Sequence, residues 1–435
     1  MELILVGTYL VLFFIFVLRQ WQFSLYWLIL ILPTYLIRFD IFGLPTTFLE
    51  ITFGVIFLVW LIKFARADWN NLIKFVKENK LATSFVAIFF LASVVGILVS
   101  DMWYYSLGQW RAYFLEPMLL VMMIIGRGGA LPVRRLLLAL GLSTLSVSVL
   151  ALSQEFFGGP FAPSLWDDNL GGRVTSFFTT PNAIGLYCAP LFFIILSLKK
   201  YATEHYQQLV YFCLTGLTLI AIYFSFSQGT WIGLGVGLVI FGYLVGYKKV
   251  ATAVVVFGIM AVVAIPSLRS AVMFADTAGH NRLILWSDTT QFLTRSPQNF
   301  VFGAGIRQYF RKVEKADYDP KVLERLIYPH NLFLNFWSEI GLFGMMAYVG
   351  LLGCWTYWAI KIYQKDNWLG ACLIAALAAL VVHGLVDVPY FKNDLAFIFW
   401  VMWAVVFLVY QNFVIPVRPN EVTSTLGVKT GIQSQ

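Results

Sequence analysis

The sequence predicts an all-α, polytopic integral membrane protein: one helical bundle of about twelve or thirteen transmembrane helices with one long external loop. Three observations lead to this prediction. Of the 435 residues, 60% are hydrophobic and only 12% are charged, whereas a soluble globular chain carries about 25% charged residues. The mean hydropathy is +0.79. Apolar runs long enough to cross a bilayer recur along the chain, and a single extended polar segment, residues 266–329, interrupts them.

Thirteen apolar runs are candidates for membrane spans. One of the first two need not cross fully, so twelve or thirteen spans are expected. The runs cover residues 2–18, 22–37, 46–64, 81–100, 108–125, 136–157, 180–198, 209–226, 230–247, 250–265, 330–360, 368–386 and 395–412. The predicted organisation is a set of membrane helices over 1–265, an external loop with amphipathic helices over 266–329, C-terminal membrane helices over 330–412, and a disordered cytoplasmic tail over 413–435.

The connections between the runs predict the orientation in the membrane. Lysine and arginine cluster in residues 63–80, 127–135, 199–200, 248–249 and 361–365, and these clusters alternate with cation-poor connections. The positive-inside rule assigns the clusters to the cytoplasm. By alternation, the opposite, external face holds Asp101 and residues 157–181, 225–230, 266–329 and 387–394.

The charge and the cysteines exclude other classes of protein. The formal charge of +8 does not indicate a nucleic-acid partner, because most cations lie in short loops between apolar runs; the lipid bilayer is the expected partner. The four cysteines lie inside apolar segments without metal-binding spacing, so they are expected to pack as small hydrophobic side chains.

The clearest functional signal is the segment Tyr328-Pro329-His330-Asn331, which opens an apolar run directly after the polar loop. His330 is one of only four histidines. The loop before it holds nine Lys/Arg against six Asp/Glu, and its arginines are Arg269, Arg282, Arg295, Arg307, Arg311 and Arg325. Imidazole titrates near neutral pH, and guanidinium stays charged and offers paired donors to oxyanions. This combination at one membrane face suits an enzyme that acts on a lipid-linked anion.

Four motifs occur in order along the second half of the chain. They are Arg173-Val-Thr-Ser-Phe-Phe-Thr-Thr-Pro181-Asn182, Ser225-Phe-Ser-Gln228-Gly-Thr-Trp231, Arg282…Trp286 with Ser296-Pro297…Gly303-Ala-Gly305, and His330-Asn331…Glu339-Ile-Gly341…Gly344. Together they resemble the "R…G-x-F…PN", "T-x-S-R-G", "R…W…hP…G-x-G" and "HN…L…E-x-G-x-x-G" patterns of the O-antigen ligase and polymerase superfamily. The resemblance extends from about residue 173 to residue 348.

The resemblance implies a membrane glycosyltransferase of polysaccharide or lipopolysaccharide biosynthesis in the bacterial cell envelope. Such an enzyme moves a glycan from a polyprenyl-diphosphate carrier, such as undecaprenyl diphosphate, to an acceptor hydroxyl at the outer face of the inner (cytoplasmic) membrane. The acceptor is a glycolipid, a glycan or a protein. His330 is the expected catalytic base. No cofactor and no metal ion is expected, because arginines take the place of the cation.

Arginines are the expected ligands of the donor diphosphate, since guanidinium forms bidentate, charge-assisted bonds to phosphate oxygens. Arg173 and Arg282 are the first candidates, and Arg307 and Arg311 are further ones. The alternative for any one of them is a contact with a lipid headgroup or a loop ion pair. Gln228 departs from the pattern, because the superfamily usually has arginine there. Glutamine can bind phosphate without charge, so either another cation such as Arg307 or Arg311 compensates or donor binding is weaker.

Several other polar groups are candidate supporting residues. Asn331, Asn335 and Glu339 follow one another at intervals of four, which predicts one stripe on a helix below His330. For Glu339, hydrogen bonding between helices is the alternative role, because an ionisable group inside the bilayer must be paired or protonated. His383 and Asp387 end the next-to-last apolar run on the same face and are expected to support the site.

Other functions remain open at this stage. Within the class, the alternative is an O-antigen or surface-polysaccharide polymerase, whose acceptor is itself a lipid-linked glycan. From another class, the alternative is a flippase or transporter of lipid-linked glycans, but transporters tend to show internal repeats and broken helices at the bilayer midplane, and the sequence shows neither clearly. The adjacent Asp167 and Asp168 are weak evidence for a metal site.

Overall fold

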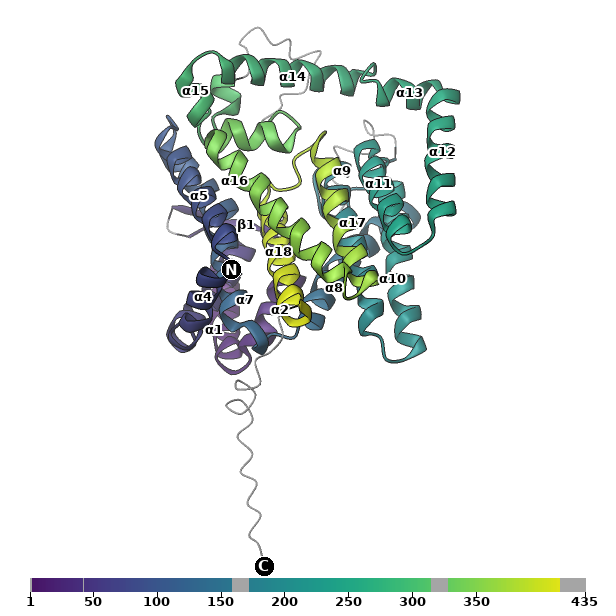
Figure 1. Ribbon diagram of the computed structural model, residues 1–435. Coiled ribbons are helices and arrows are strands. Elements are labelled where there is room, and N and C mark those ends of the chain that lie inside the picture. The colour runs from purple at the N-terminus through teal and green to yellow at the C-terminus, as the bar shows by residue number, and fades with distance from the viewer. Residues whose placement is uncertain (1, 42, 159–171, 314–327, 415–435) are drawn as a thin grey trace, which may run out of the picture.

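The computed structural model describes residues 2–41, 43–158, 172–313 and 328–414, and in this part of the chain helices dominate (Figure 1). The strands of these ranges are β1 (Arg38–Ile41) and β2 (Leu44–Thr47), which pair antiparallel as a hairpin. The predicted class, a polytopic bundle of membrane helices, is therefore confirmed. The expected tail lies almost entirely outside the described residues, as do Asp167, Asp168 and Arg325.

The N-terminal part of the bundle is a series of apolar helices joined by short connections. Its elements are α1 (Glu2–Arg19), α2 (Trp21–Leu30), the 3-10 helix η1 (Leu32–Leu36), α3 (Phe48–Lys63), α4 (Ala65–Glu78), α5 (Lys80–Leu98), α6 (Trp103–Trp110), the π-helical turn η2 (Arg111–Leu115), α7 (Glu116–Arg127), η3 (Gly128–Ala130) and α8 (Val133–Phe157). Thr47 and Glu50 form a reciprocal capping box at the start of α3, which fixes where the hairpin ends and the helix begins.

The C-terminal part continues the bundle and contains the predicted long loop. Its elements are α9 (Pro181–Ser197), η4 (Leu198–Tyr201), α10 (His205–Phe224), α11 (Gln228–Leu244), α12 (Lys248–Ala264), α13 (Pro266–Val272), α14 (Thr277–Thr294), α15 (Pro297–Phe302), η5 (Tyr309–Val313), α16 (Leu332–Tyr363), α17 (Asn367–Gly384) and α18 (Asn393–Val414). Every predicted apolar run of the chain is largely helical in the structure.

The described residues contain eight helices that are long and apolar enough to cross a membrane. Counting each sharply bent helix pair as one span raises the number to ten, and two shorter apolar helices, Val6–Arg19 and Gln228–Leu244, are further candidates. The ten-residue α2 is too short to cross, since a span needs about 20 residues. One of the first two apolar runs therefore does not cross fully.

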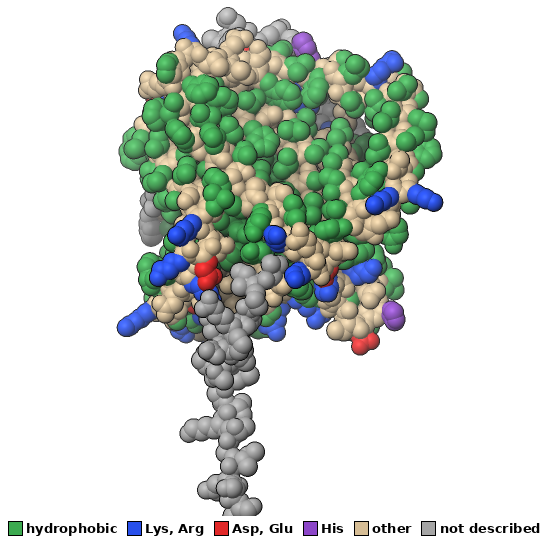
Figure 2. Space-filling view, in the orientation of Figure 1, with side chains coloured by type: hydrophobic (Ala, Val, Ile, Leu, Met, Phe, Trp, Pro, Cys, Tyr) green, Lys and Arg blue, Asp and Glu red, His purple; other side chains and the backbone are tan. Residues whose placement is uncertain are grey.

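The helices differ in how deeply they are buried. Of the most hydropathic stretches of α9 and α18, 94% is buried inside the protein, so these two helices form the centre of the bundle. By contrast, all side chains of residues 252–260 on α12 are exposed, and most of them are apolar. Figure 2 shows a broad hydrophobic belt across the face drawn. An apolar helix that is exposed on all sides is stable only where lipid surrounds it.

Cationic connections meet at one end of the bundle, here called the basic end and defined by Arg127, Lys199 and Lys200. Arg127 lies 3.2 Å from Asp68 on α4, and Lys200 lies 2.6 Å from Asp366 at the start of α17. Figure 2 shows lysine and arginine gathered below the hydrophobic belt on the face drawn. The predicted clusters thus come from distant parts of the sequence but lie together, as the positive-inside rule requires.

The long loop forms helices across the opposite end of the bundle, where α13 and α14 run over the ends of the other helices (Figure 1). One of the helices expected in this loop is α14. Its buried residues include Leu285, Thr289 and Leu293, which are four residues apart and form one face. The third motif continues in the short helix α15, which is followed by Gly303 and Gly305.

The segment after α15 packs tightly against α16. Gly303 has φ +72°, and a Cβ there would lie 2.5 Å from the carbonyl oxygens of Trp337 and Ser338, so only glycine fits. The helix α16 is itself broken at Gly341, where φ is +76° and ψ is 177°. The first part of α16 is therefore a separate short segment between His330 and the kink.

Candidate functional site

His330 lies at the end of the bundle opposite the basic end, immediately before α16. Its Nδ1 is 3.3 Å from Oδ1 of Asp387, which lies in the connection between α17 and α18. The ring of Tyr328 lies against the imidazole with 4.7 Å between the ring centroids. His330 has φ +48°, a conformation that is uncommon for residues other than glycine. The surrounding contacts must hold it there, and such conformations concentrate at functional sites.

The carboxylate of Asp387 determines which nitrogen of His330 is available. Burial by itself would raise the pKa of Asp387, but His330, His383 and the backbone N–H of Val388 hold that pKa below its ordinary value. Asp387 is therefore charged and accepts a hydrogen bond from Nδ1–H. Neutral imidazole carries one proton, so Nε2 is left as a proton acceptor. This is the tautomer that a general base needs.

Arg282 on α14 lies beside this pair. Its Nε donates to the carbonyl oxygen of Val386 at 2.9 Å, one residue before Asp387. Four residues further along α14, the indole nitrogen of Trp286 donates to the carbonyl oxygen of Pro329 at 2.9 Å. One helix of the loop thus contacts both segments that carry the His330–Asp387 pair. Within the described ranges, the two terminal nitrogens of Arg282 make no hydrogen bond, so they can bind two oxygens of an anion.

Arg173 lies at the turn between α10 and α11, which also carries Gln228. Its Nε donates to the carbonyl oxygen of Ser225 at 2.8 Å, and its Nη2 donates to Oδ1 of Asn182 at 3.0 Å. Burial lowers the pKa of Arg173 from its ordinary value. Gln228 is the first residue of α11, and its side chain is exposed. Arg173 is thus bound to the turn that carries Gln228, whereas Arg307 and Arg311 line a separate cavity.

Two glycines of α11 connect this turn to the His330 segment. A Cβ at Gly229 would lie 2.9 Å from the Val386 side chain and 3.2 Å from the ring of His383, and a Cβ at Gly233 would lie 3.1 Å from Cβ of His383. Because α11 approaches α17 this closely, Gly229 and Arg282 both contact Val386. His383 is 2% exposed and packs against both glycines.

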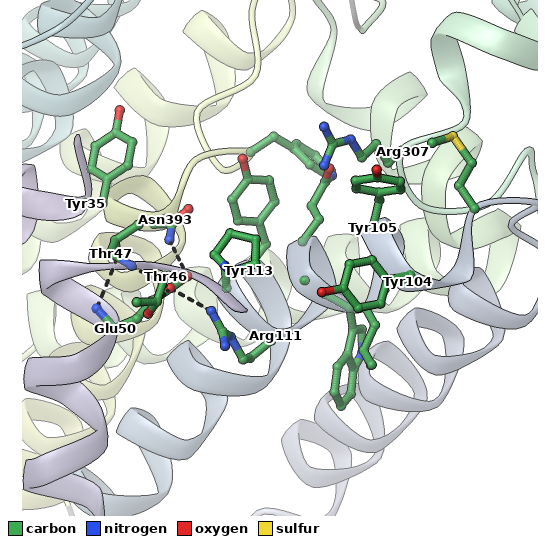
Figure 3. A pocket seen from close by; sticks show the side chains of 18 of the residues that line it. Tyr35, Thr46, Thr47, Glu50, Tyr104, Tyr105, Arg111, Tyr113, Arg307 and Asn393 are labelled. Carbon is green, nitrogen blue, oxygen red and sulfur yellow. Dashed lines mark hydrogen bonds and ion pairs between the residues drawn. The ribbon is translucent and has the colours of Figure 1, made fainter. Parts of the chain in front are cut away.

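Arg307, Arg311 and Glu339 belong to a second group of residues. They line a cavity of about 1150 Å³ that is not lined by His330, Arg282 or Arg173. The guanidinium of Arg307 lies over the ring of Tyr105 at 5.4 Å (Figure 3). Glu339 accepts from the side-chain nitrogen of Gln109 at 3.1 Å. The arginines expected to bind one diphosphate are therefore divided between two places.

The predicted stripe on α16 is wrong for its first member. Asn331 is the N-cap of α16 with extended φ and ψ, and its Oδ1 accepts from the backbone N–H groups of Phe333 and Leu334. Its Nδ2 donates to the carbonyl oxygen of Leu385 at 3.0 Å. Asn331 therefore points toward the connection after α17, whereas Asn335 and Glu339 line the cavity. A four-residue spacing describes one face only where the backbone is helical, and residue 331 precedes the helix.

Some residues near the site were not found from the sequence. Tyr328 contacts His330 and also lines the cavity. The sequence predicts no separate role for it beyond its place in the segment that opens the apolar run. Lys392 lies in the connection between α17 and α18; burial lowers its pKa, and Asp394 and Asp387 act in the opposite direction. The sequence offered only two signals for these residues: an aromatic residue two positions before His330, and a lone lysine in an external connection. Neither signal is specific for a functional site.

Metal-ligating side chains do not cluster here. Among the described residues, no group of three or more His, Cys, Asp or Glu side chains could hold a metal ion. The four cysteines are free thiols, and those buried on α9, α16 and α17 pack in the hydrophobic core.

The fold and the site together define a class: a multi-pass helical membrane protein with an imidazole–carboxylate pair and guanidinium groups at one end of the bundle. Residues 213–349 match the family model described as O-antigen ligase. The match runs from α10 past the kink in α16 and includes Gln228, Arg282, His330 and Glu339. This match supports the resemblance to the O-antigen ligase and polymerase superfamily over residues 213–349. The motif that begins at Arg173 precedes the matched residues. No curated protein matches the chain.

Proposed function

We propose that the protein is a membrane glycosyltransferase that moves a glycan from a polyprenyl diphosphate to an acceptor hydroxyl, without a metal ion. His330 is the general base. The acceptor O–H gives its proton to Nε2 of His330 while its oxygen bonds to the anomeric carbon of the donor sugar. The bond between that carbon and the diphosphate oxygen breaks, and the electron pair leaves with the diphosphate. The configuration at the anomeric carbon is inverted.

Arg282 is the main ligand of the departing diphosphate in this proposal. Negative charge grows on the phosphate oxygens as the bond breaks, and a charge-assisted hydrogen bond is worth about 1.5–3 kcal/mol. Arg282 is supported as this ligand because only its Nε forms a hydrogen bond within the described residues, to the carbonyl oxygen of Val386. Both terminal nitrogens are therefore left for phosphate. Arg173 already uses Nε and Nη2 in hydrogen bonds to Ser225 and Asn182, so fewer of its N–H groups are available for phosphate. These bonds also hold the turn in place.

The lipid part of the donor is expected to approach beside α12. This helix contacts α11 and α13, and its exposed residues are mostly apolar, including Val254, Phe257 and Ile259. It leads from the basic end to α13 and then to α14, the helix that carries Arg282. A polyprenyl chain that lies along α12 in the bilayer would have its diphosphate near the start of the loop. The active site then faces the outer, periplasmic side of a bacterial inner membrane.

The single observation that supports this function most directly is the pairing of His330 with Asp387 beside Arg282. The test is transfer by the purified, full-length protein with a defined polyprenyl-diphosphate glycan. His330→Ala should lower the transfer rate by about 10²–10⁴-fold, the usual contribution of a general base. His280→Ala is the matched control, because His280 is an exposed histidine on the same loop, in α14. Wild-type transfer by a folded His330→Ala protein would refute the mechanism.

A further inference from the structure

The cavity next to Tyr328 has no role in the mechanism above. It lies between two parts of the chain that are distant in sequence: the β1–β2 hairpin with α6 and η2, and η5 with the first part of α16. Its volume is about 1150 Å³. Ligand pockets commonly measure about 300–1,000 Å³, so this cavity has room for more than one sugar ring. Its wall includes Tyr328, whose ring lies against His330, so its contents would lie close to the base.

Several arginines of the cavity wall form no salt bridge within the described residues. Four arginines line it, but Arg111 is paired with Glu50 at 2.6 Å and with Glu116 at 3.3 Å (Figure 3). In the ranges that the structure describes, Arg38 and Arg311 have no carboxylate partner, and Arg307 lies on the face of Tyr105.

The carboxylates of the cavity wall are already engaged. Glu50 also accepts from Asn393, Thr46 and the backbone of Thr47, and Asp40 accepts from the backbone N–H of Gly43. Glu339 accepts from Gln109 and also lies near Arg307. Arg38 and Arg311 keep their N–H donors for an oxyanion, and the guanidinium of Arg307 lies beside them in the wall; guanidinium binds oxyanions well because it presents paired N–H donors.

The apolar part of the wall consists mainly of aromatic rings. Tyr104 and Tyr105 line the cavity and are 46% and 52% exposed, so their rings are accessible to a ligand. Figure 3 shows the Tyr105 ring beside Arg307 and the Tyr104 ring next to that of Tyr105. Tyrosine offers an apolar face and a hydroxyl on one rigid side chain. Such rings pack against the C–H face of a sugar while the hydroxyl binds the sugar's edge.

A buried polar side chain also lacks a partner. Asn335 is 0% exposed and lines the cavity, and within the described residues neither its Nδ2 nor its Oδ1 forms a hydrogen bond. An unsatisfied buried amide costs about 1–3 kcal/mol, so it is retained only where something else satisfies it. A sugar hydroxyl can donate to the oxygen and accept from the nitrogen of one carboxamide.

We propose that this cavity binds the acceptor, and that the acceptor is a glycan with an anionic group, a carboxylate or a phosphate, held by Arg38, Arg307 and Arg311. This inference rests on the proposed transferase function and adds the chemical class of the acceptor. The donor diphosphate lies at Arg282, on the other side of His330. The acceptor hydroxyl then reaches His330 past Tyr328. The aromatic rings hold the neutral part of the glycan, and Asn335 binds one of its hydroxyl groups.

The test compares acceptors that differ only in charge. The purified full-length protein is given one polyprenyl-diphosphate glycan and, in turn, a neutral oligosaccharide, the same oligosaccharide with a hexuronate, and the same with a phosphate monoester. Wild-type protein should show a lower KM for one or both anionic acceptors than for the neutral one. Arg311→Gln and Arg38→Gln should each raise the KM for the anionic acceptor by roughly 10–150-fold, which corresponds to one charge-assisted bond, and leave the neutral acceptor unchanged. Arg311→Lys should lose only part of this preference.

Arg295→Gln is the control, because Arg295 is an exposed arginine of the same loop that does not line the cavity. Equal KM values for charged and neutral acceptors in the wild-type protein would overturn the proposal, as would a rise in donor KM alone in the arginine variants.

A binding measurement separates this inference from the transferase mechanism. The same three oligosaccharides are titrated into His330→Ala protein while tryptophan fluorescence is recorded. Tighter binding of the anionic glycans, lost in the His330→Ala/Arg311→Gln double variant, supports the cavity assignment even if no transfer is ever seen. Absence of transfer by the wild-type protein counts against the proposed function, whereas absence of a charge preference in this titration counts against the cavity.

Discussion

Replacing Asp387 by asparagine is the most specific test of the His330 mechanism, because it keeps the size of the side chain and removes only its charge. In the wild-type protein Nδ1–H of His330 donates to the carboxylate, which fixes the ring and leaves Nε2 free to accept a proton. Asparagine keeps a carbonyl oxygen as acceptor but no longer stabilises the positive imidazolium that forms during the reaction. Asp387 is therefore a positioning residue, and its effect passes through His330.

The size of the effect follows from the geometry. A hydrogen bond to a charged group is worth about 1.5–3 kcal/mol, which is a factor of roughly 10–150 in rate. The distance of 3.3 Å is at the long end for an N–H···O bond, so the loss should fall in the lower half of that range. It should be smaller than the loss on removing the imidazole itself in His330→Ala.

The assay is single-turnover transfer with saturating donor, measured for the wild-type protein, Asp387→Asn and the control Asp101→Asn. Asp101 is 64% exposed and pairs with Lys312 at 3.1 Å, and such a surface pair contributes about 0–1 kcal/mol. Asp387→Asn should lower the rate of the chemical step and leave the KM for the donor nearly unchanged. A folded Asp387→Asn protein with the wild-type rate would refute the general-base argument, and so would an equal loss in both variants.

The same substitution has a consequence for stability against pH. The pKa of Asp387 is lowered from 3.8 in the folded protein, so its charged form stabilises the fold above that pH, and this contribution is lost as the pH falls through the folded value. The difference in thermal stability between wild-type protein and Asp387→Asn in detergent should therefore be largest at neutral pH and should shrink on acidification. A difference that grows as the pH falls would contradict the assigned charge.

Three further predictions concern other parts of the site. Arg282→Ala should raise the donor KM by roughly 10–150-fold with little loss of thermal stability, whereas Arg173→Ala should also lower the stability, because Arg173 bonds two segments; equal stability in the two variants would contradict this. Gln228→Arg should preserve or raise the transfer rate, measured with limiting donor, and a large loss would mean that added charge is harmful there. Gly341→Ala should destabilise the protein by about 1–3 kcal/mol in thermal unfolding, because its φ is +76°, while Gly353→Ala, with free space around its Cβ, should not.

The sequence alone was sufficient for the fold class, because hydrocarbon thickness requires long apolar runs and each run is a local property of the chain. The basic clusters were also readable locally, and in the structure they meet at one end. His330 was predicted because it opens an apolar run directly after a polar loop, and Arg282 because it is an arginine of that loop that belongs to another of the four motifs. The β1–β2 hairpin was missed, since its eight strand residues lie between two apolar runs and show no alternation of polar and apolar residues.

Only the tertiary structure decided which residues meet. His330 and Asp387 are 57 residues apart, and Arg307 lies more than 60 residues beyond α11, so no spacing rule connects either one to its neighbours. The bundle helices are apolar on every side, and hydropathy therefore does not encode which helix lies against which. The arrangement of neighbouring helices depends on small residues such as Gly229 and Gly233, which let α11 approach α17, and on the break at Gly341. Close packing at these points divides the arginines between the His330 segment and the cavity beside Tyr328.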